Sequence, residues 1–201
     1  MRAESVRRSA LADYADRFAA VSAATHSDLS IAELPFLSQV NFRVDPNDAN
    51  LMERVASGLG GLALPLLPNT VTSRGDRRAL WLGPDEWLIV GPDGKQAAFL
   101  DALGVALAGA FGSIVDVSAN RTVLDIRGSK ALELLAHGVA IDLHPRSFGP
   151  GRCAQTFLAK AQVIIELRNE EATFHVWVRT SFASYVAAWL LDAAASISSG
   201  S

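Results

Sequence analysis

The sequence predicts an α+β fold in which helices pack against antiparallel sheet. Half of its 201 residues are apolar and 19% are charged, a balance that supports a buried core and argues against disorder. Strand-like and helix-like segments alternate along the chain, and short turns join some strands into hairpins. The same order of elements occurs twice, at a spacing of about 80 to 90 residues. These observations predict one domain made of two similar halves.

An amphipathic helix is predicted near the beginning of the chain. Its apolar positions recur at helical spacing beside charged residues: Leu11, Tyr14, Phe18 and Val21. The helix has no local partner, so it must dock on the body of the domain or on another chain. Residues 25–35 are interpreted as a polar connection, and residues 1–38 as a helix and connector outside the repeated core.

The first repeat is predicted at about residues 39–110. Asp45 and Pro46, a capping acid and a proline, mark the start of its first helix, and Gly60 ends that helix. A leucine-rich helix follows the break at 92–94. The strands are predicted at 40–44, 71–74, 79–82 and 87–90, with a turn at 83–86. The core-facing helix positions are predicted to be Leu51, Val55, Leu59, Leu100, Leu103 and Leu107.

The second repeat, at about residues 113–195, follows the same order. Strands are predicted at 123–126, near Phe157, at 163–167 and at 174–178, with a solvated turn at 169–171. Helices are predicted to begin at Gly128 and Ser181. Their core-facing positions are Leu132, Leu135 and Val139 in the first, and Phe182, Val186, Trp189, Leu190 and Ala193 in the second. Residues 196–201 are predicted to form a disordered tail.

Charge and hydropathy exclude several classes of partner. The net charge of −3 predicts no general affinity for nucleic acid or for an anionic membrane. Residues 9–24 contain Asp13, Asp16 and Arg17, so they lack the apolar region of a signal peptide. The most apolar run, 102–115, is too short and too glycine-rich to span a bilayer. We therefore expect a cytoplasmic protein that binds neither nucleic acid nor membrane.

Cys153 is the one cysteine, so an internal disulfide is impossible. Arg152 beside it could lower the pKa of the thiol, and His137 or His144 could supply a base. A buried structural cysteine is the favoured alternative, and a redox sensor at Cys153 stays open. His137 near a helix end is interpreted as a favourable charge at the helix C-terminus.

No motif for a cofactor or a metal is found. The glycines at 58–61 follow a helix, so they are interpreted as its C-terminal cap and not as a nucleotide-binding loop. The histidines, the cysteine and the carboxylates show no close metal-ligand spacing. The four tryptophans fall on strand or helix periodicity and are assigned mainly to the core. The sequence therefore predicts no catalytic residue, no cofactor-binding residue and no metal ligand in this chain.

Two stretches of the second half resemble the aminomethyltransferases, which include the glycine-cleavage T-protein. The first is Ile114-Val115-Asp116-Val117-Ser118. The second runs from Thr122 through Arg127-Gly128-Ser129-Lys130-Ala131 into a leucine helix. In that family a D-V-S motif precedes a strand that ends in glycine and a leucine-rich helix. The resemblance covers about residues 114–192.

A second resemblance covers nearly the whole chain. The segments at 33–43 (E-L-P-F-L-S-Q-V-N-F-R), 81–89 (W-L-G-P-D-E-W-L-I) and 151–156 (G-R-C-A-Q-T) are similar to the gamma subunits of heterotetrameric sarcosine oxidases. This resemblance implies a folate-binding-type domain at 39–195, made of two intertwined ferredoxin-like halves.

The same resemblance implies partners and cofactors outside this chain. Such an oxidase has alpha, beta, gamma and delta subunits, and it demethylates sarcosine to glycine with formation of hydrogen peroxide. It passes the one-carbon unit to tetrahydrofolate. FAD, FMN and NAD belong to alpha and beta, and zinc to delta, while gamma is a structural partner of alpha. We expect Leu11, Phe18 and residues 35–37 to dock on alpha.

Departures from the aminomethyltransferase pattern indicate that the fold is kept without the chemistry. Those enzymes commonly continue D-V-S with H-M-G, where this chain has Ala119-Asn120-Arg121. They place a catalytic aspartate at a position corresponding roughly to 160–163, but residues 154–165 contain no acid. The alternatives are a stand-alone tetrahydrofolate-dependent one-carbon enzyme and an iron–sulfur-assembly protein. The K-G-C-[YF]-x-G-Q-E motif of the latter matches residues 151–156 poorly.

Overall fold

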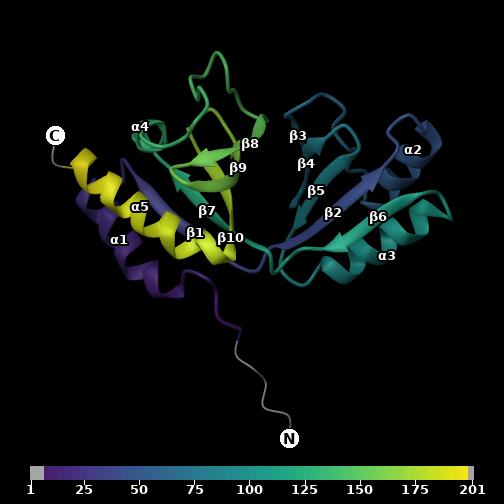
Figure 1. Ribbon diagram of the computed structural model, residues 1–201, viewed down its shortest axis with the longest axis horizontal. Coiled ribbons are helices and arrows are strands. Elements are labelled where there is room, and N and C mark those ends of the chain that lie inside the picture. Colours follow the sequence, from purple (N-terminus) through teal and green to yellow (C-terminus); the bar gives the residue numbers. More distant parts are fainter. Residues whose placement is uncertain (1–6, 199–201) are drawn as a thin grey trace, which may run out of the picture.

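The computed structural model describes residues 7–198, which form two helix-covered sheets that face each other like the arms of a V (Figure 1). Sheet A contains, from edge to edge, β1 (Ser30–Leu34), β7 (Arg121–Arg127), β10 (Phe174–Arg179), β9 (Ala161–Leu167) and β8 (Cys153–Leu158). Sheet B contains β3 (Val71–Arg74), β4 (Arg77–Gly83), β5 (Glu86–Gly91), β2 (Ser38–Val44) and β6 (Gly112–Asp116). All neighbouring strands are antiparallel.

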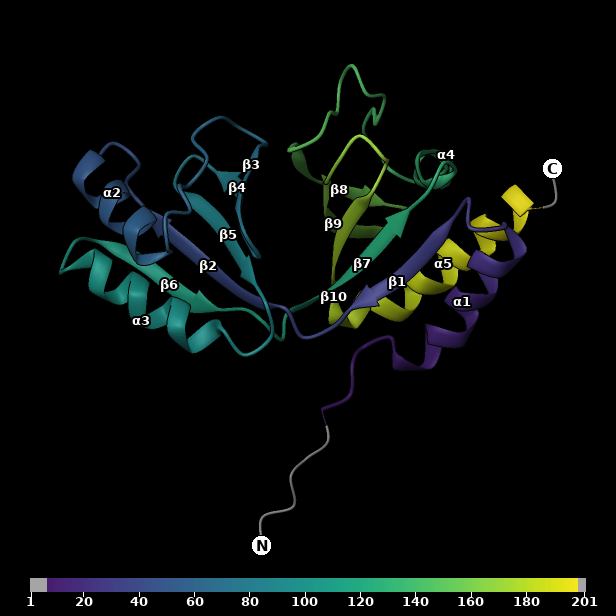
Figure 2. The same cartoon turned by 180° about the vertical axis from the view of Figure 1, so that it is seen from behind.

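Helices cover the outer side of each arm (Figures 1 and 2). Sheet A carries α1 (Ala15–Ala24), which follows the 3-10 turn η1 (Ala12–Tyr14), together with α4 (Ala131–Ala136) and α5 (Thr180–Ser198). Sheet B carries α2 (Ala49–Gly58) and α3 (Gln96–Leu107). The predicted α+β class, with helices packed on antiparallel sheets, is confirmed. None of the helices within residues 7–198 is long and apolar enough to cross a membrane.

The two halves exchange their first strands. Each repeat has the order strand, strand, helix, three strands, helix: β1 to α3 in the first and β6 to α5 in the second. However, β1 pairs with β7 in sheet A, and β6 pairs with β2 in sheet B. The sheets therefore have equivalent strand orders, with the exchanged strand at one edge of each. This exchange intertwines the halves, as the resemblance implied.

Both exchanged strands are absent from the elements predicted from the sequence. Residues 25–35 were expected to be a polar connection, but they contain β1, so that prediction is wrong. In β1 only Ile31 is buried, and in β6 no residue is buried. Strands recognised by alternation need one buried face, which these edge strands lack. The boundary at residue 38 likewise does not separate a docking segment, because β1 belongs to sheet A.

Helix α2 begins later than the sequence indicates. Its N-cap is Asp48, whose carboxylate Oδ1 accepts a hydrogen bond of 2.9 Å from the Leu51 amide. Asp45 instead accepts one from the Asn47 amide in the turn before the helix. At the other end the Gly61 amide donates to the Ala56 carbonyl at 2.7 Å, with φ of +85° at Gly61. The predicted glycine cap is confirmed.

The buried faces of α4 and α5 differ from the predicted ones. Helix α4 ends at Ala136, so Val139 is not part of it, and its buried residues are Ala131, Leu134 and Leu135. In α5, Ala183 is buried and Phe182 is 45% exposed. The last residues of α5 also correct the predicted tail, because 196–198 are helical and Ile197 is buried. Residues 199–201 lie outside the described residues.

Three apolar clusters hold the fold together. Core A lies between sheet A and its helices, and core B lies between sheet B and α2 and α3. Between the sheets lies a third cluster, the inter-sheet layer, which both sheets supply. Its buried members are Leu80, Leu82, Leu88 and Val90 from sheet B, and Val123, Cys153, Ile164 and Trp177 from sheet A. Because each sheet buries both faces, its central strands are nearly continuous apolar runs.

The N-terminal helix belongs to core A. Leu11 is 1% exposed and Phe18 is 3% exposed, and both pack in that core. The expectation that they dock on another subunit is therefore wrong, because the chain itself buries them. In the connector, Leu37 packs against the inter-sheet layer, and the Arg7 guanidinium lies 4.2 Å from the centre of the Phe36 ring. Of residues 35–37, Pro35 is exposed, and Phe36 and Leu37 are partly buried.

Candidate functional site

Ionisable side chains form a row across sheet A, on its face toward sheet B. Strand pairing sets Asp125 of β7 opposite His175 of β10, His175 opposite Glu166 of β9, and Glu166 opposite Cys153 of β8. Asp125 is 1% exposed and Glu166 is fully buried. Buried carboxylates beside a histidine and a thiol are the group of side chains in which acid–base or nucleophilic chemistry would be sought first.

Cations lie next to both acids of this row. Asp125 accepts a hydrogen bond of 2.8 Å from Nε of Arg127, and its Oδ1 lies 3.5 Å from Nε2 of His175. Glu166 lies 3.2 Å from the guanidinium of Arg78, which comes from β4 of sheet B, and 3.4 Å from that of Arg168. The pair of Arg78 and Glu166 is a buried ionic contact between the two sheets.

Burial and pairing shift the pKa values of these acids in opposite directions. Burial raises the pKa of Glu166 to about 7, and the charge of Arg78 only partly opposes this effect. Burial would also raise the pKa of Asp125, but hydrogen bonds from His175 and Arg127 outweigh it and the pKa is lowered. Asp125 is therefore a paired anion, and Glu166 is a carboxyl group that can titrate near neutral pH.

Cys153 is a poor nucleophile in this setting. Its side chain is buried, and Sγ lies 3.5 Å from the Thr70 carbonyl oxygen and 3.6 Å from that of Trp81. Burial raises the pKa of the thiol to about 12, and nearby Glu166 adds to this, while Arg152 opposes it only weakly. Since the thiolate is the reactive form, the geometry favours a structural cysteine.

Neither histidine considered from the sequence serves Cys153. His137 is exposed at the C-terminal end of α4, where the sequence placed it. His144 is exposed in a loop, and its Nδ1 accepts a hydrogen bond from the Arg146 amide. The structure brings His175 into the ionisable row instead. In the sequence, His175 is a single polar residue among apolar residues of a strand, as are Glu166 and Asp125. This pattern was the one feature that could have pointed to the row.

A second polar region lies at the other end of the same face of sheet A. Arg121 of β7 and Arg179 of β10 are directly opposite each other. They line a cavity of about 290 Å³ with side chains from β8 and β9. The other residues of the lining are Gln155, Thr156, Phe157, Gln162, Val163 and Ile164. This lining contains no acid, as the absence of acids from 154–165 indicates.

The residues compared with the aminomethyltransferase motifs lie at the β8–β9 turn and at the start of β7. The turn at 159–160 joins β8 to β9, and the Lys160 amide donates to the Tyr185 hydroxyl at 3.3 Å. Of Ala119-Asn120-Arg121, only Arg121 reaches the cavity. Within residues 7–198 no group of three or more histidine, cysteine or acidic side chains is arranged to hold a metal ion.

The sequence matches the sarcosine oxidase, gamma subunit family over residues 43–196. Sarcosine oxidase subunit gamma of Arthrobacter sp. and that of Corynebacterium sp. (strain P-1) are each 36% identical to this chain. Each alignment covers 94% of this chain and 90% of the relative. The chain belongs to the sarcosine oxidase gamma subunit family.

Solved structures agree with this membership of the gamma subunit family. A chain of the heterotetrameric sarcosine oxidase of Corynebacterium sp. U-96, in complex with pyrrole 2-carboxylate, matches with a TM-score of 0.83 and 32% identity. That match covers 96% of this chain and 97% of the other. The glycine cleavage system aminomethyltransferase T of Bartonella henselae matches with a TM-score of 0.61 at 13% identity, over 86% of this chain and 48% of that one. The second likeness shows a shared fold, and it confirms the predicted relation to the aminomethyltransferase fold.

Proposed function

We propose that this chain is the non-catalytic gamma subunit of a cytoplasmic, heterotetrameric sarcosine oxidase and that it stabilises the alpha subunit. The complex, with beta and delta, demethylates sarcosine oxidatively to glycine, releases hydrogen peroxide and transfers the one-carbon unit to tetrahydrofolate. FAD, FMN, NAD, tetrahydrofolate and zinc bind to the other subunits. The observation that carries the proposal is the 36% identity to gamma subunits over 94% of the chain.

The ionisable row supports a structural role. Asp125 and Glu166 are buried next to cations, and Cys153 is held as a thiol by a pKa raised to about 12. A catalytic base or nucleophile has to reach a substrate in the protonation state that its task requires. Glu166 instead pairs with Arg78 of sheet B, and Cys153 contacts the Trp81 carbonyl oxygen of the same sheet. The row therefore favours cohesion of the two halves over catalysis.

Co-expression tests the proposal most directly. The affinity-tagged chain is produced together with the three other subunits, and the eluate is examined by gel electrophoresis, absorbance and peroxide release with sarcosine. We expect the larger subunits to co-elute with flavin absorbance and sarcosine-dependent peroxide. An untagged chain is the control for adventitious binding to the resin.

Omission of the chain is the complementary test. The three other subunits are expected to give a less stable assembly when this chain is left out. Equal yield, stability and turnover without it would sink the proposal. Titration of the isolated chain with tetrahydrofolate then examines the stand-alone one-carbon enzyme, since binding by this chain alone would favour that function.

A further inference from the structure

Two arginines face each other without a counter-ion in the cavity at the end of sheet A. Arg121 and Arg179 occupy directly opposed positions on β7 and β10. Neither guanidinium makes a hydrogen bond or an ion pair with any residue in the described part of the chain. Like charges directly opposite each other in a sheet are destabilising, and a partly buried cation needs a partner. The pair therefore leaves room for an anion that would bind both guanidinium groups.

The electrostatic surroundings of Arg121 agree with this geometry. Burial lowers the pKa of Arg121, and the charge of Arg179 lowers it further. Glu86 of sheet B opposes these effects more weakly, and its Oε1 already accepts a hydrogen bond of 2.7 Å from the Asn41 side chain. Charge compensation from the chain itself is therefore incomplete.

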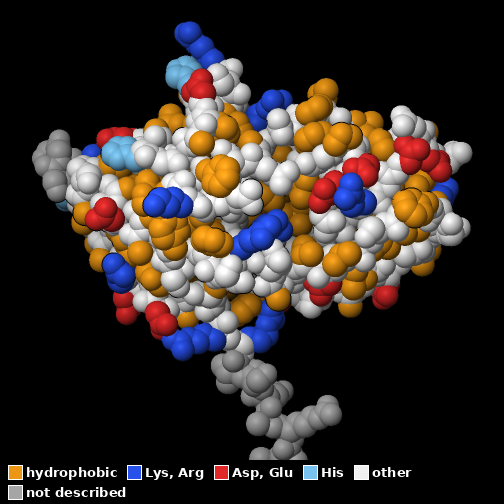
Figure 3. Space-filling view, in the orientation of Figure 1, with side chains coloured by type: hydrophobic (Ala, Val, Ile, Leu, Met, Phe, Trp, Pro, Cys, Tyr) orange, Lys and Arg blue, Asp and Glu red, His pale blue; other side chains and the backbone are white. Residues whose placement is uncertain are grey.

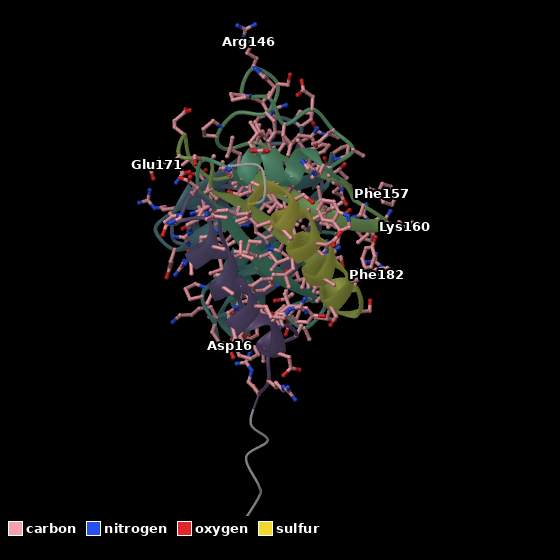
Figure 4. All side chains as sticks on the ribbon, turned by 90° about the vertical axis from the view of Figure 1, so that its left-hand side faces the viewer. Asp16, Arg146, Phe157, Lys160, Glu171 and Phe182 are labelled. Atoms are coloured by element: carbon pink, nitrogen blue, oxygen red, sulfur yellow. The ribbon has the colours of Figure 1, made fainter. Side chains whose placement is uncertain are left out.

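One exposed aromatic side chain lines the cavity, and two more lie in the first turns of α5, which directly follows Arg179. Phe157 lines it and is 47% exposed, and Phe182 and Tyr185 in the first turns of α5 are 45% and 40% exposed. The hydrogen bond from the Lys160 amide to the Tyr185 hydroxyl holds the β8–β9 turn against α5. Figure 4 shows Phe157, Lys160 and Phe182 along the same side of the molecule. Figure 3 shows basic side chains next to apolar ones near the beginning of α5.

The arginine pair and these three aromatic residues together constitute one surface, the arginine–aromatic surface: Arg121, Arg179, Phe157, Phe182 and Tyr185. Aromatic residues and arginine are the types enriched at the centres of protein interfaces. Clustered exposed aromatic groups also cost free energy unless they are covered. A small anion would satisfy the arginines but leave the aromatic rim exposed, whereas a protein surface would cover both.

We propose that the arginine–aromatic surface docks another subunit of the oxidase and that a carboxylate side chain of that subunit enters the cavity between Arg121 and Arg179. The inference rests on the proposed function and adds the docking surface and the chemistry of the partner. Planar guanidinium groups bind carboxylates through paired hydrogen bonds, so one Asp or Glu can bridge both arginines. Apolar side chains around that acid pack on Phe157 and Phe182.

Charge reversal at the exposed arginine is the first test. The complex carrying Arg179→Glu is purified after co-expression of all four subunits, and the apparent dissociation constant of this chain, measured by serial dilution of the complex, is compared with that of the wild type. We expect affinity to fall by about 10- to 100-fold, because a desolvated charge pair becomes a repulsive one. Phe182→Ala is expected to weaken binding by about tenfold through lost apolar contact.

Arg146→Glu is the matched control. Arg146 is an exposed arginine whose side chain makes no ion pair with described residues, and Figure 4 shows it at the end of a loop remote from Phe157 and Phe182. The affinity of the Arg146→Glu chain for the other subunits should stay within about twofold of the wild type. Thermal unfolding of each isolated variant checks that a loss of binding is not a loss of folding.

Three results would overturn the inference. Wild-type affinity of folded Arg179→Glu and Phe182→Ala would remove the docking surface and leave the proposed function intact. Stabilisation of the isolated chain by sodium succinate over sodium chloride at equal ionic strength, abolished by Arg121→Met while assembly is unchanged, would assign the cavity to free carboxylates. Failure of the wild-type chain to associate at all would sink the proposed function and this inference together.

Discussion

Half A, which is sheet A with α1, α4 and α5, and half B, which is sheet B with α2 and α3, share one strand order, but only half A has an additional helix. In the repeats α5 corresponds to α3 and α4 to α2, so α1 has no counterpart in half B. Helix α1 packs on β1, where Ile31 is 3% exposed. The equivalent strand β6 contacts α3 but has no additional helix on it, and near it Phe111 is 99% exposed and Val115 47% exposed. The repeat determines which strands pair, while the segment outside the repeat determines how deeply an edge strand is buried.

The largest expected change in stability tests this comparison at α1. Phe18→Ala should lower the free energy of unfolding by about 3–5 kcal/mol, because it leaves a cavity in core A. Phe111→Ala, next to β6 at the corresponding edge of half B, should change it by less than about 0.5 kcal/mol, because the Phe111 side chain is already exposed. Denaturant unfolding of both variants measures the difference. Similar values for the two variants would mean that α1 docks only loosely.

A smaller loss of stability is expected on substitution of Gly128, which lies against the backbone that connects α1 to β1. Gly128 follows β7 with φ of +112°, and a Cβ there would lie 2.2 Å from the Asp28 carbonyl oxygen. Asp45, which follows β2 in half B, stands at the equivalent position. Gly128→Ala should therefore cost about 2–4 kcal/mol, through the clash and backbone strain.

Gly75→Ala is the control for Gly128→Ala. Gly75 also has a positive φ, +60°, but no atom lies within 4 Å of an added Cβ. Its cost should be about 1 kcal/mol, from conformation alone. Thermal or denaturant unfolding compares the two variants. Equal costs at Gly75 and Gly128 would contradict the close approach of the Asp28 backbone.

The inter-sheet layer offers a test of what each half contributes to it. Sheet B contributes mainly leucines, whereas the buried Glu166 of sheet A lies beside this layer and pairs with Arg78 of sheet B. The pKa of Glu166 rises from 4.5 to about 7 on folding, so the folded state binds more protons and stability must fall as pH rises through this range. The expected loss is on the order of 1–3 kcal/mol.

Glu166→Gln should remove most of that slope. Unfolding free energies of both proteins at several pH values between 4.5 and 7.5 provide the measurement. The pKa of Asp125 is lowered, so its effect on stability has the opposite pH dependence. Ionised Asp125 stabilises the folded state, and this contribution is lost only as pH falls through the folded pKa of Asp125. An unchanged slope in Glu166→Gln would show that another group titrates.

The smallest effect is expected at Cys153. Because the thiol is buried and its pKa is raised to about 12, it should react with a thiol reagent only after unfolding. Cys153→Ala should reduce stability by no more than about 1 kcal/mol and leave assembly of the complex unchanged. Rapid labelling of the folded chain, or loss of assembly in the variant, would support the redox sensor that the sequence left open.

Much of the fold could be predicted because it depends on local pattern. Strands β2, β3, β4, β5, β7, β8, β9 and β10 and helices α1 to α5 all fall on the predicted segments. The buried faces of the helices were predicted less accurately. In α5, Phe182 was predicted on the buried face and the next residue, Ala183, is buried instead, because this helix is apolar on several sides. The sequence also indicated correctly that Trp87 and Trp177 are buried.

The candidate sites could not be predicted in the same way. Asp125, His175 and Glu166 lie on three strands far apart in the sequence, and only the strand register sets them side by side. Arg121 and Arg179 likewise meet only through the pairing of β7 with β10. Each of these residues taken alone is one polar position in or beside a strand. Periodicity carries no information on which strands become neighbours.

The sequence by itself therefore determined the fold class, the repeat, most elements and the resemblance to the sarcosine oxidase gamma subunit family, because these depend on short-range pattern and local motifs. Tertiary structure alone decided the exchange of β1 and β6, the burial of Leu11 and Phe18 and the pairing of Arg121 with Arg179. Those features arise from contacts between distant segments. The role of an exposed edge strand or of a buried charge depends on its neighbours, and only the fold brings those neighbours together.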